Sequence, residues 1–318
     1  MMYSGQAAID YLINEVGKTD VAESSHWQKY HSLFKVTSEG FEGLQGFGGR
    51  AKRRIKILRV VEKFLQSRFR KMGRCNFSVI DHLAEEMVLK QNRTYDLDVL
   101  RQVLTISFLQ STVPQVLSSQ SIGCVIGDGF ASMTSLLLKS QSAGRVVLVN
   151  LNKTLLVDLW YLKLWMGDHV FASSVDLVTN KDELERALAK PVGSGQVIAI
   201  QAMNHELIRD CPIKFVVNIA SMQEMDPPVI AAYFQDLRDI KSDDALIFYC
   251  CNREEKSLPD GAVTKFSEYP WSFKDQTIVD ELCPWHQTFY SFRPPFFRPY
   301  DGPIRHRLSV IMKTNKGN

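Results

Sequence analysis

The stretch "CVIGDGFASMTSLLL" at residues 124–138 holds the residues best suited to chemistry. Apolar residues lead into the turn Gly127-Asp128-Gly129, and an apolar pattern with helical spacing follows at once. A strand, a glycine turn and a helix N-terminus in this order bind nucleotide-like cofactors in α/β proteins. The third glycine of the dinucleotide-binding pattern is missing, however, and Ala131 stands near its place.

This turn predicts a cofactor without a pyrophosphate, and S-adenosylmethionine is such a cofactor. Gly127 and Gly129 would let the backbone approach its methionine moiety, and amides near Ala131 and Ser132 would favour its carboxylate. The remaining expected cofactor contacts follow other strands: Asn150 for the ribose, Gln201 and Ala202 for the adenine, and Asn218 and Ser221 nearby. A nicotinamide cofactor is a lesser alternative, because no acid stands near residue 150.

A second polar turn, "SMQEM" at residues 221–225, lies between an apolar strand and an apolar helix. Asp226 can cap that helix, and Pro227 occupies its first position, where a missing N–H costs nothing. The turn therefore falls at the carboxyl end of a strand, where open α/β sheets bind ligands. Glu224 pointing into a cleft would accept the proton of a substrate hydroxyl; a solvated loop is the alternative.

Other side chains could share this chemistry. His205 in "QAMNHELI" and His286 in "CPWHQTFY" are further candidates for the base. Expected contacts of the acceptor are Gln223, Asn252, Arg253 and Lys256, with Tyr269, Trp271 and Trp285 as rings that could stack on a sugar. Asn252, Arg253 and Lys256 could bind sugar hydroxyls or an anionic group of the acceptor. The alternative to sugar stacking is that the three rings fill a core.

Apolar runs supply the strands that must position these residues. Continuous apolar strands are typical of a parallel sheet covered by helices on both faces. Five such runs alternate with helical patterns: residues 123–127, 144–150, 196–202, 214–221 and 245–252. Residues 286–293 and 306–314 alternate enough to predict an antiparallel pair added to the sheet. The predicted fold class is therefore α/β, with a Rossmann-like core.

A helical region, residues 1–112, is expected to precede this core domain, residues 113–318. Within it, residues 50–74 hold eleven Lys or Arg against Glu62 alone. Apolar residues recur there at spacings of three and four: Leu58, Val61, Leu65 and Phe69. The pattern predicts an amphipathic helix whose basic face is solvated, or else meets an anionic substrate, membrane surface or nucleic acid.

The composition, 45% hydrophobic and 23% charged residues among 318, is that of an ordinary globular protein. The first residues lack a basic n-region and an apolar h-region, and no apolar run reaches about 18 residues. We therefore expect neither a signal peptide nor a membrane span, and a cytoplasmic location. The six cysteines form no CxxC pair, so reduced thiols are expected and no metal site.

"NIASMQEM" at residues 218–225, with the later "IFYCCNREEKSL", resembles the sugar O-methyltransferases of bacterial polysaccharide gene clusters. The resemblance spans roughly residues 120–275. It implies an S-adenosylmethionine-dependent enzyme with a class I methyltransferase core and an N-terminal helical extension. Such enzymes usually carry acids two residues before the first glycine and at the end of the second strand, where this chain has Val125 and Asn150.

The sequence thus predicts an S-adenosylmethionine-dependent O-methyltransferase acting on a sugar or another small hydroxylated acceptor. An RNA methyltransferase using the basic residues 50–74 is a second hypothesis, although no RNA-binding signature accompanies them. A non-catalytic cofactor-binding protein is a third, motivated by Val125 and Asn150. The oligomeric state stays open.

Overall fold

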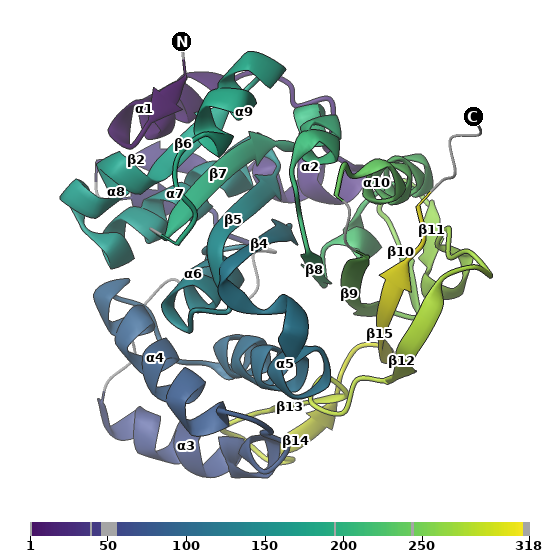
Figure 1. Cartoon of the computed structure of the whole chain (residues 1–318). Coiled ribbons are helices and arrows are strands. Elements are labelled where there is room, and N and C mark those ends of the chain that lie inside the picture. Colours follow the sequence, from purple (N-terminus) through teal and green to yellow (C-terminus); the bar gives the residue numbers. More distant parts are fainter. Residues whose placement is uncertain (1, 39, 46–55, 194, 243–244, 314–318) are drawn as a thin grey trace.

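The computed structural model describes residues 2–38, 40–45, 56–193, 195–242 and 245–313. Within them, a nine-stranded sheet runs through the molecule (Figure 1). Six neighbouring strands are parallel, in the order β6 (Val175–Val178), β7 (Gln196–Gln201), β5 (Ala143–Asn150), β4 (Ser118–Ile126), β8 (Phe215–Ile219) and β9 (Leu246–Arg253). Antiparallel strands extend both ends: β1 (Tyr3–Ser4) beside β6, and β15 (Ile304–Ile311) then β12 (Gln276–Leu282) beyond β9.

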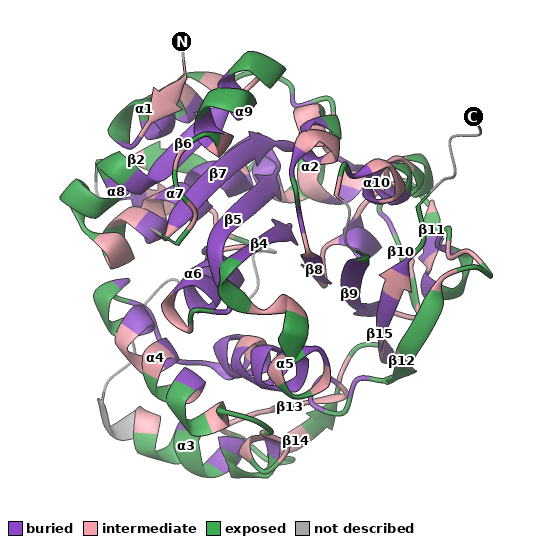
Figure 2. Cartoon of the chain, in the orientation of Figure 1, coloured by how far each residue is buried: buried purple, intermediate pink, exposed green. Residues whose placement is uncertain are grey.

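The central strands are apolar throughout because both faces of the sheet are covered. Every residue of β5 and of β7 is buried, as the centre of Figure 2 shows. Alternate side chains enter different cores: Val146 and Leu148 pack on one face, Val147 and Val149 on the other. The structure confirms the predicted fold class, a mostly parallel Rossmann-like sheet with helices on both faces and an antiparallel strand pair.

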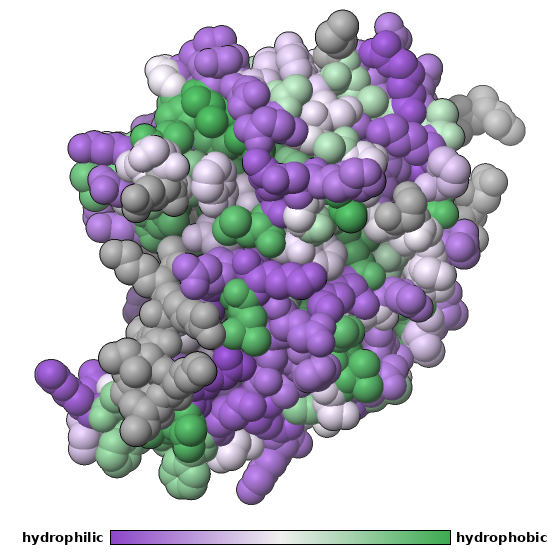
Figure 3. Space-filling model, turned by 90° about the vertical axis from the view of Figure 1, so that its left-hand side faces the viewer, coloured by the Kyte–Doolittle hydropathy of each residue, from purple (hydrophilic) through white to green (hydrophobic). Residues whose placement is uncertain are grey.

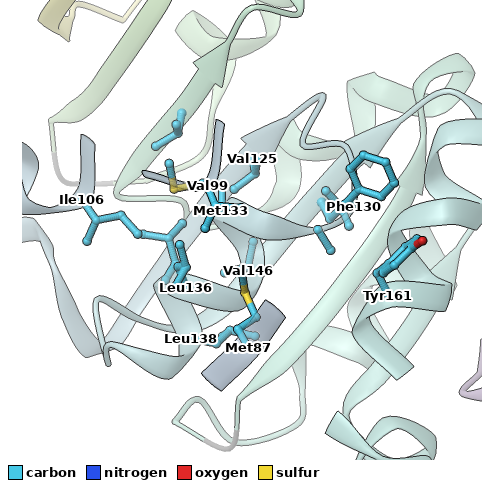
Figure 4. Close-up of a cluster of buried hydrophobic side chains, with 14 of the residues drawn as sticks. Met87, Val99, Ile106, Val125, Phe130, Met133, Leu136, Leu138, Val146 and Tyr161 are labelled. Carbon is cyan, nitrogen blue, oxygen red and sulfur yellow. The ribbon is translucent and has the colours of Figure 1, made fainter. Parts of the chain in front are cut away.

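Two layers of helices complete these cores. The first layer comprises α1 (Gln6–Glu15), α4 (Phe77–Lys90), α5 (Leu97–Thr112), α6 (Ser132–Lys139), α7 (Asn152–Met166) and α8 (Asp168–Ser174). Figure 4 shows part of this core, where Met133 and Leu136 of α6 lie among side chains of the sheet and of α4 and α5. The opposite layer comprises α9 (Lys181–Leu188), the 3₁₀ segment η2 (Ala202–Asp210) and α10 (Pro227–Asp239).

Shorter elements surround this frame. They are α2 (Ser25–His31), the hairpins β2 (Lys35–Thr37) with β3 (Gly40–Glu42) and β10 (Glu255–Ser257) with β11 (Val263–Lys265), the pair β13 (Thr288–Tyr290) and β14 (Phe297–Pro299), and the 3₁₀ turns η1 (Pro114–Val116), η3 (Met222–Glu224) and η4 (Phe266–Glu268). In the part of the chain that the structure describes, no helix is long and apolar enough to span a membrane.

The C-terminal strand pair differs in detail from the sequence prediction. β15 lies where it was expected, but its outer partner is β12 rather than residues 286–293. Part of that segment, β13, pairs with β14 in a separate small sheet. β12 is exposed along nearly its whole length, so no apolar alternation marks it in the sequence. Strands β1 and β6 also escaped prediction, because each has four residues or fewer.

The N-terminal region is largely helical, and α5 ends at Thr112, beside the predicted boundary at residue 113. The basic helix appears as α3 (Lys56–Arg70), and residues 50–55 and the side chain of Leu58 lie outside what the structure describes. Leu65 and Phe69 are buried as expected, whereas Val61 is 45% exposed. Glu62 and Gln66 are buried as well, so the buried stripe includes Glu62, Leu65, Gln66 and Phe69 and leaves out Val61.

Acidic residues of α4 pair with much of the basic face of α3. Glu85 Oε1 forms ion pairs with Arg59 Nη2 at 3.2 Å and with Lys63 Nζ at 2.7 Å. Asp81 forms an ion pair with Arg70. These pairs favour packing of α3 on α4 over an open nucleic-acid arm.

Figure 3 shows hydrophobic side chains on one face of the molecule in several separate groups rather than as one continuous area.

Candidate cofactor and acceptor cleft

One cleft opens at the carboxyl ends of β4, β5 and β8, and residues from distant parts of the chain line it. The central sheet contributes Ile126–Gly129, Asn150, Leu151, Ala202 and Ile219–Ser221. The N-terminal region contributes Ser24, Trp27, Arg93, Asp98 and Arg101, and the C-terminal part contributes Arg253, Lys256, His286 and Tyr300. The carboxyl edge of a parallel sheet, where strand order changes direction, is the usual ligand site of this architecture.

Four residues of the glycine turn have a left-handed backbone. Gly127 and Gly129 have φ of 71° and 70°, and Phe130 and Ala131 follow with φ of 60° and 48°. Such a conformation costs a residue other than glycine about 1–2 kcal/mol. Phe130 is 1% exposed, and the guanidinium of Arg93 lies 4.1 Å above its ring, so packing holds the strained segment.

The amides of the helix that follows the turn are bound to carboxylates of the chain. Asp128 accepts hydrogen bonds from the backbone N–H groups of Met133 at 2.9 Å and Thr134 at 2.7 Å. The N–H of Ala131 donates to Asp158 at 2.7 Å. The amide of Ala131, which the sequence analysis assigned to the cofactor carboxylate, is therefore taken by Asp158.

The fully buried Asp158 lies near Asp128, a half-buried acid of the turn itself. Burial raises the pKa of Asp128, and burial together with the nearby Asp128 raises the pKa of Asp158 well above its usual range. Asn150 donates from Nδ2 to Asp158 at 2.8 Å and accepts from the Leu151 N–H at 3.0 Å. Asn150 lines the cleft, but its amide group is used to hold Asp158.

Arg93 is the cation of this part of the cleft. It is 2% exposed, it donates to Ser132 Oγ at 3.0 Å and to Gln91 Oε1 at 3.2 Å, and burial lowers its pKa. Sequence reasoning missed it because it stands between α4 and α5, with no spacing that relates it to the glycine turn. Asp158 could have been suspected from the sequence, because it is a lone acid within the apolar run of α7.

Two asparagines lie beneath the "SMQEM" turn rather than in the cleft. Asn218 donates to the Ile126 carbonyl at 2.9 Å and accepts from the Met222 N–H at 3.2 Å and from Asn252 Nδ2 at 2.8 Å. Asn252 also accepts from the Gln223 N–H at 3.1 Å. Both asparagines are fully buried, so they fix the turn while Ser221 and Gln223 line the cleft.

Glu224 lines the cleft beside the side chains of a lysine and a histidine. Its Oε1 lies 2.7 Å from Lys256 Nζ and 3.3 Å from Nε2 of His26, on α2. All three side chains are about one-tenth exposed. The Glu224 carbonyl also accepts from Ser24 Oγ, so the N-terminal region helps to hold this turn. His26 was not predicted, since nothing in the sequence relates α2 to residue 224.

The two candidate histidines have different surroundings. His205 pairs with Asp236 of α10, and its ring centre lies 4.6 Å from that of Tyr233; it does not line the cleft. His286 does line the cleft. Its pKa is held well below the usual range by burial and by the neighbouring charges of Arg101 and Arg253.

Several other predicted contacts also lie away from the cleft. Gln201 is 2% exposed and donates to Asn152 at 2.6 Å, although the adjacent Ala202 lines the cleft. Tyr269 and Trp271 belong to an aromatic group around Phe234, and Trp285 packs on Phe108. These three rings fill the core, which was the alternative reading; the rings that line the cleft are Trp27, Tyr233 and Tyr300.

Comparisons with known proteins find no matching family model and no matching curated protein. Among solved structures, the chain resembles TrmK of M. capricolum bound to S-adenosylhomocysteine, with a TM-score of 0.35, 11% identity and coverage of 65% of this chain and 69% of that one. It also resembles the mitomycin 7-O-methyltransferase MmcR, with a TM-score of 0.36, 13% identity and coverage of 67% of this chain and 56% of that one. A third similar structure is that of the pyocyanin biosynthetic protein PhzM, with a TM-score of 0.38, 10% identity and coverage of 67% of this chain and 57% of that one. The chain spans just over half the length of the latter two proteins.

Proposed function

We propose that the chain is an S-adenosylmethionine-dependent O-methyltransferase that acts on a sugar or another small hydroxylated acceptor. One observation carries the proposal. A carboxylate at the carboxyl end of β8, Glu224, shares a cleft with the left-handed glycine turn that follows β4. This arrangement supports a cofactor site beside a candidate proton acceptor on one edge of the sheet.

The residues around the glycine turn suit this cofactor. Arg93 is a buried cation that can bind the methionine carboxylate, in place of the helix amides that Asp128 and Asp158 occupy. Ala202 and Leu151 offer apolar surface for an adenine along the ends of β7 and β5. When bound, the cofactor supplies an electrophilic methyl group on its sulfonium centre.

The remaining residues would prepare the acceptor hydroxyl. Glu224 accepts its proton or fixes its orientation, and Lys256 and His26 keep the carboxylate in one position. Holding the hydroxyl in line with the methyl group lowers the entropic part of the barrier. His286 is the second candidate for the proton acceptor, because it also lines the cleft. His205 is the weakest candidate, because it is paired with Asp236.

The charges of the cleft favour an acceptor with an anionic group. Arg253 lines the cleft, its side chain is 19% exposed, and its Nε is buried without a hydrogen-bond partner. Its Nη1 donates to Asp301 at 2.9 Å, and its guanidinium lies 5.3 Å from the centre of the Tyr300 ring. A carboxylate or phosphate would satisfy Nε, since guanidinium groups match the geometry of both anions. A uronic acid or a sugar phosphate has this chemistry.

Calorimetry with S-adenosylmethionine tests the cofactor site. We expect binding at one site per chain, and at least tenfold weaker binding by Arg93→Gln, which removes the charge that would bind the carboxylate. Arg186→Gln, a change at an exposed position of α9, is the matched control and should bind as the wild type does. Absence of binding by the wild-type chain would contradict the proposal.

The acceptor is tested by release of S-adenosylhomocysteine. Uronic acids and sugar phosphates should support turnover better than the corresponding neutral sugars, and Arg253→Gln should remove that preference. Cofactor binding without turnover on either class would favour the non-catalytic hypothesis instead.

A further inference from the structure

Three buried ligand groups meet at the wall of the cleft. They are the thiols of Cys251, on β9, and Cys283, just after β12, and the imidazole of His286. Their ligand atoms all lie within 4.8 Å of one another, and Cys251 Sγ is 3.9 Å from His286 Nδ1. Across the described residues, no other three His, Cys, Asp or Glu side chains come together in this way.

The fold holds these groups together from two directions. The N–H of Cys283 donates to the Ile304 carbonyl at 2.8 Å, which fixes it to the start of β15. The N–H of His286 donates to the Cys283 carbonyl at 3.1 Å, so the turn brings residues three apart to one side. β15 in turn pairs with β9, which carries Cys251. The cluster is therefore set by the sheet as well as by the sequence spacing.

The surrounding loop is also held firmly. Arg101 donates from Nε to the Trp285 carbonyl at 3.4 Å and from Nη2 to the Thr288 carbonyl at 3.0 Å. Its positive charge is balanced by Asp98 at 2.8 Å. The arginine thus supports the loop that carries two of the three ligand groups, and Asp98 offsets its repulsion of a nearby cation.

We propose that Cys251, Cys283 and His286 bind one zinc ion. Two thiolates and one imidazole form a ligand set that zinc prefers, and two thiolates balance its charge inside the protein. Zinc bonds of about 2.3 Å to sulfur and 2.0–2.1 Å to nitrogen place tetrahedral ligand atoms roughly 3.5 Å apart, close to the observed 3.9 Å. Because His286 lines the cleft, the fourth position would be taken by water from the cleft.

This site goes beyond the proposed methyl transfer and gives His286 a different task. As a zinc ligand, His286 would fix the wall of the cleft instead of accepting a proton. No metal was expected from the sequence, because the six cysteines form no CxxC pair. Cys251 and Cys283 stand 32 positions apart, and the pairing of β9, β15 and β12 brings them together.

Elemental analysis of the full chain, purified without chelator, tests the proposal. We expect about one zinc per chain, and loss of zinc in Cys283→Ser and in Cys251→Ser. Cys250→Ser is the matched control: Cys250 is equally buried on the same strand, but it belongs to the opposite core. Cys75→Ser, at an exposed position, is a second control in case the first does not fold. Both controls should keep the metal.

Cobalt substitution supplies a readout that does not depend on activity. Cobalt in the wild-type chain should give thiolate-to-cobalt charge-transfer absorption, and Cys283→Ser should lack it while keeping the circular dichroism of a folded protein. A wild-type chain that binds neither zinc nor cobalt after reduction would overturn the proposal. Retention of zinc by both Cys251→Ser and Cys283→Ser would overturn it as well. A disulfide between Cys251 and Cys283, found by peptide mapping, would have the same consequence.

Discussion

Glu224 contacts a lysine and a histidine side chain through one carboxylate oxygen, and this arrangement shapes what it can do. Lys256 at 2.7 Å and His26 at 3.3 Å both contact Oε1. The other carboxylate oxygen can therefore receive a hydroxyl proton while the first is held. A carboxylate with one anchored oxygen suits a group that must face the reacting centre in a single orientation.

Replacing Glu224 by Gln keeps the shape of the side chain but removes the charge. If Glu224 is the base, Glu224→Gln should bind S-adenosylmethionine normally and lower kcat by about 10²–10⁴. A raised KM with a smaller loss of kcat would instead indicate that Glu224 orients the acceptor. Steady-state kinetics and calorimetry measure the two effects separately.

Glu255→Gln, at an exposed position on β10, is the matched control and should leave kcat unchanged. Turnover by Glu224→Gln close to that of the wild type would remove Glu224 from the mechanism. The zinc experiment would then decide whether His286 remains available as the base.

The turn residue Gly127 is restricted by the protein as well as by the ligand. A β-carbon added there would lie 1.9 Å from Ser221 Oγ, and φ is 71°. Gly127→Ala should therefore lower the free energy of unfolding, with about 1–2 kcal/mol from the backbone alone. Chemical denaturation measures this loss.

The double variant Gly127→Ala with Ser221→Gly separates the two causes of this stability loss, which are the contact with Ser221 and the left-handed backbone. It should recover the part of the loss that comes from the contact with Ser221, while the backbone part persists. Equal stability of Gly127→Ala and the wild-type chain would mean that the turn adopts another conformation. Because of this contact, a bulky residue at position 127 would affect both folding and cofactor binding.

Residues close in sequence to a strand end were predictable, and those from elsewhere were not. Glu224 and the glycine turn stand directly after apolar strands, so their place at the sheet edge follows from the pattern. Arg93 and His26 come from the N-terminal region, and only the tertiary fold brings them to the cleft. The burial of Asn218 was equally hidden, because an amide can line a site or support it.

At the scale of elements, α5 begins on a buried acid. Asp96 caps it by accepting the Val99 N–H at 3.2 Å, and Asp96 is 5% exposed. Burial, with a further contribution from Asp98, raises its pKa from 3.8 to about 7, against an opposing effect of Arg93. The folded chain therefore retains a proton that the unfolded chain loses between about pH 4 and pH 7.

Stability should consequently fall as pH rises through this window, because the folded state binds more protons than the unfolded state. Asp96→Asn keeps a capping oxygen but cannot titrate. We expect the difference in unfolding free energy between variant and wild type to grow in favour of the variant from about pH 4 to pH 7, and to stay constant above. Denaturation series at several pH values measure it.

Asp128 and Asp158, whose pKa values are also raised, remain in both proteins, so their titration largely cancels in this comparison. A difference that does not vary with pH would mean that Asp96 is ionised throughout the range. A stability difference between variant and wild type that shrinks as pH rises would likewise contradict a raised pKa of Asp96.

Elements with a buried face were easier to predict than exposed ones. The central strands and α10 follow from apolar runs and from Pro227 at a helix start, although the Asp226 side chain makes no capping hydrogen bond. β12 carries no such signal, because it contributes little to either core. In α3, the buried Glu62 and Gln66 shift the stripe away from Val61, which pattern reading cannot foresee.

At the scale of the whole molecule, the cleft joins the N-terminal region to the sheet. Asp20 accepts the N–H of Asn152 at 2.9 Å, and Glu23 lies 3.4 Å from Lys153, both at the start of α7. Ser24 then contacts the carbonyl of Glu224. A ligand in the cleft would touch both parts and should stabilise them together.

We therefore expect S-adenosylmethionine to raise the unfolding temperature of the entire chain in one transition. At a concentration one hundred times the Kd, the gain in unfolding free energy should be about 2.7 kcal/mol. Scanning calorimetry with and without the cofactor measures it, and Arg93→Gln should show a smaller gain at the same concentration. Stabilisation of only part of the chain, seen as two separated transitions, would contradict this prediction.

The short strand β1 has a further consequence for association between copies of the chain. It covers the outer side of the fully buried β6 by pairing Tyr3 with Leu177 and Ser4 with Asp176. At the other end of the sheet, β12 carries a bulge and the acidic residues Asp280 and Glu281. Unpaired sheet edges invite strands of other chains, and brief, charged or irregular edges discourage them. Loss of β1 would uncover an apolar strand, and aggregation would be expected to begin at β6.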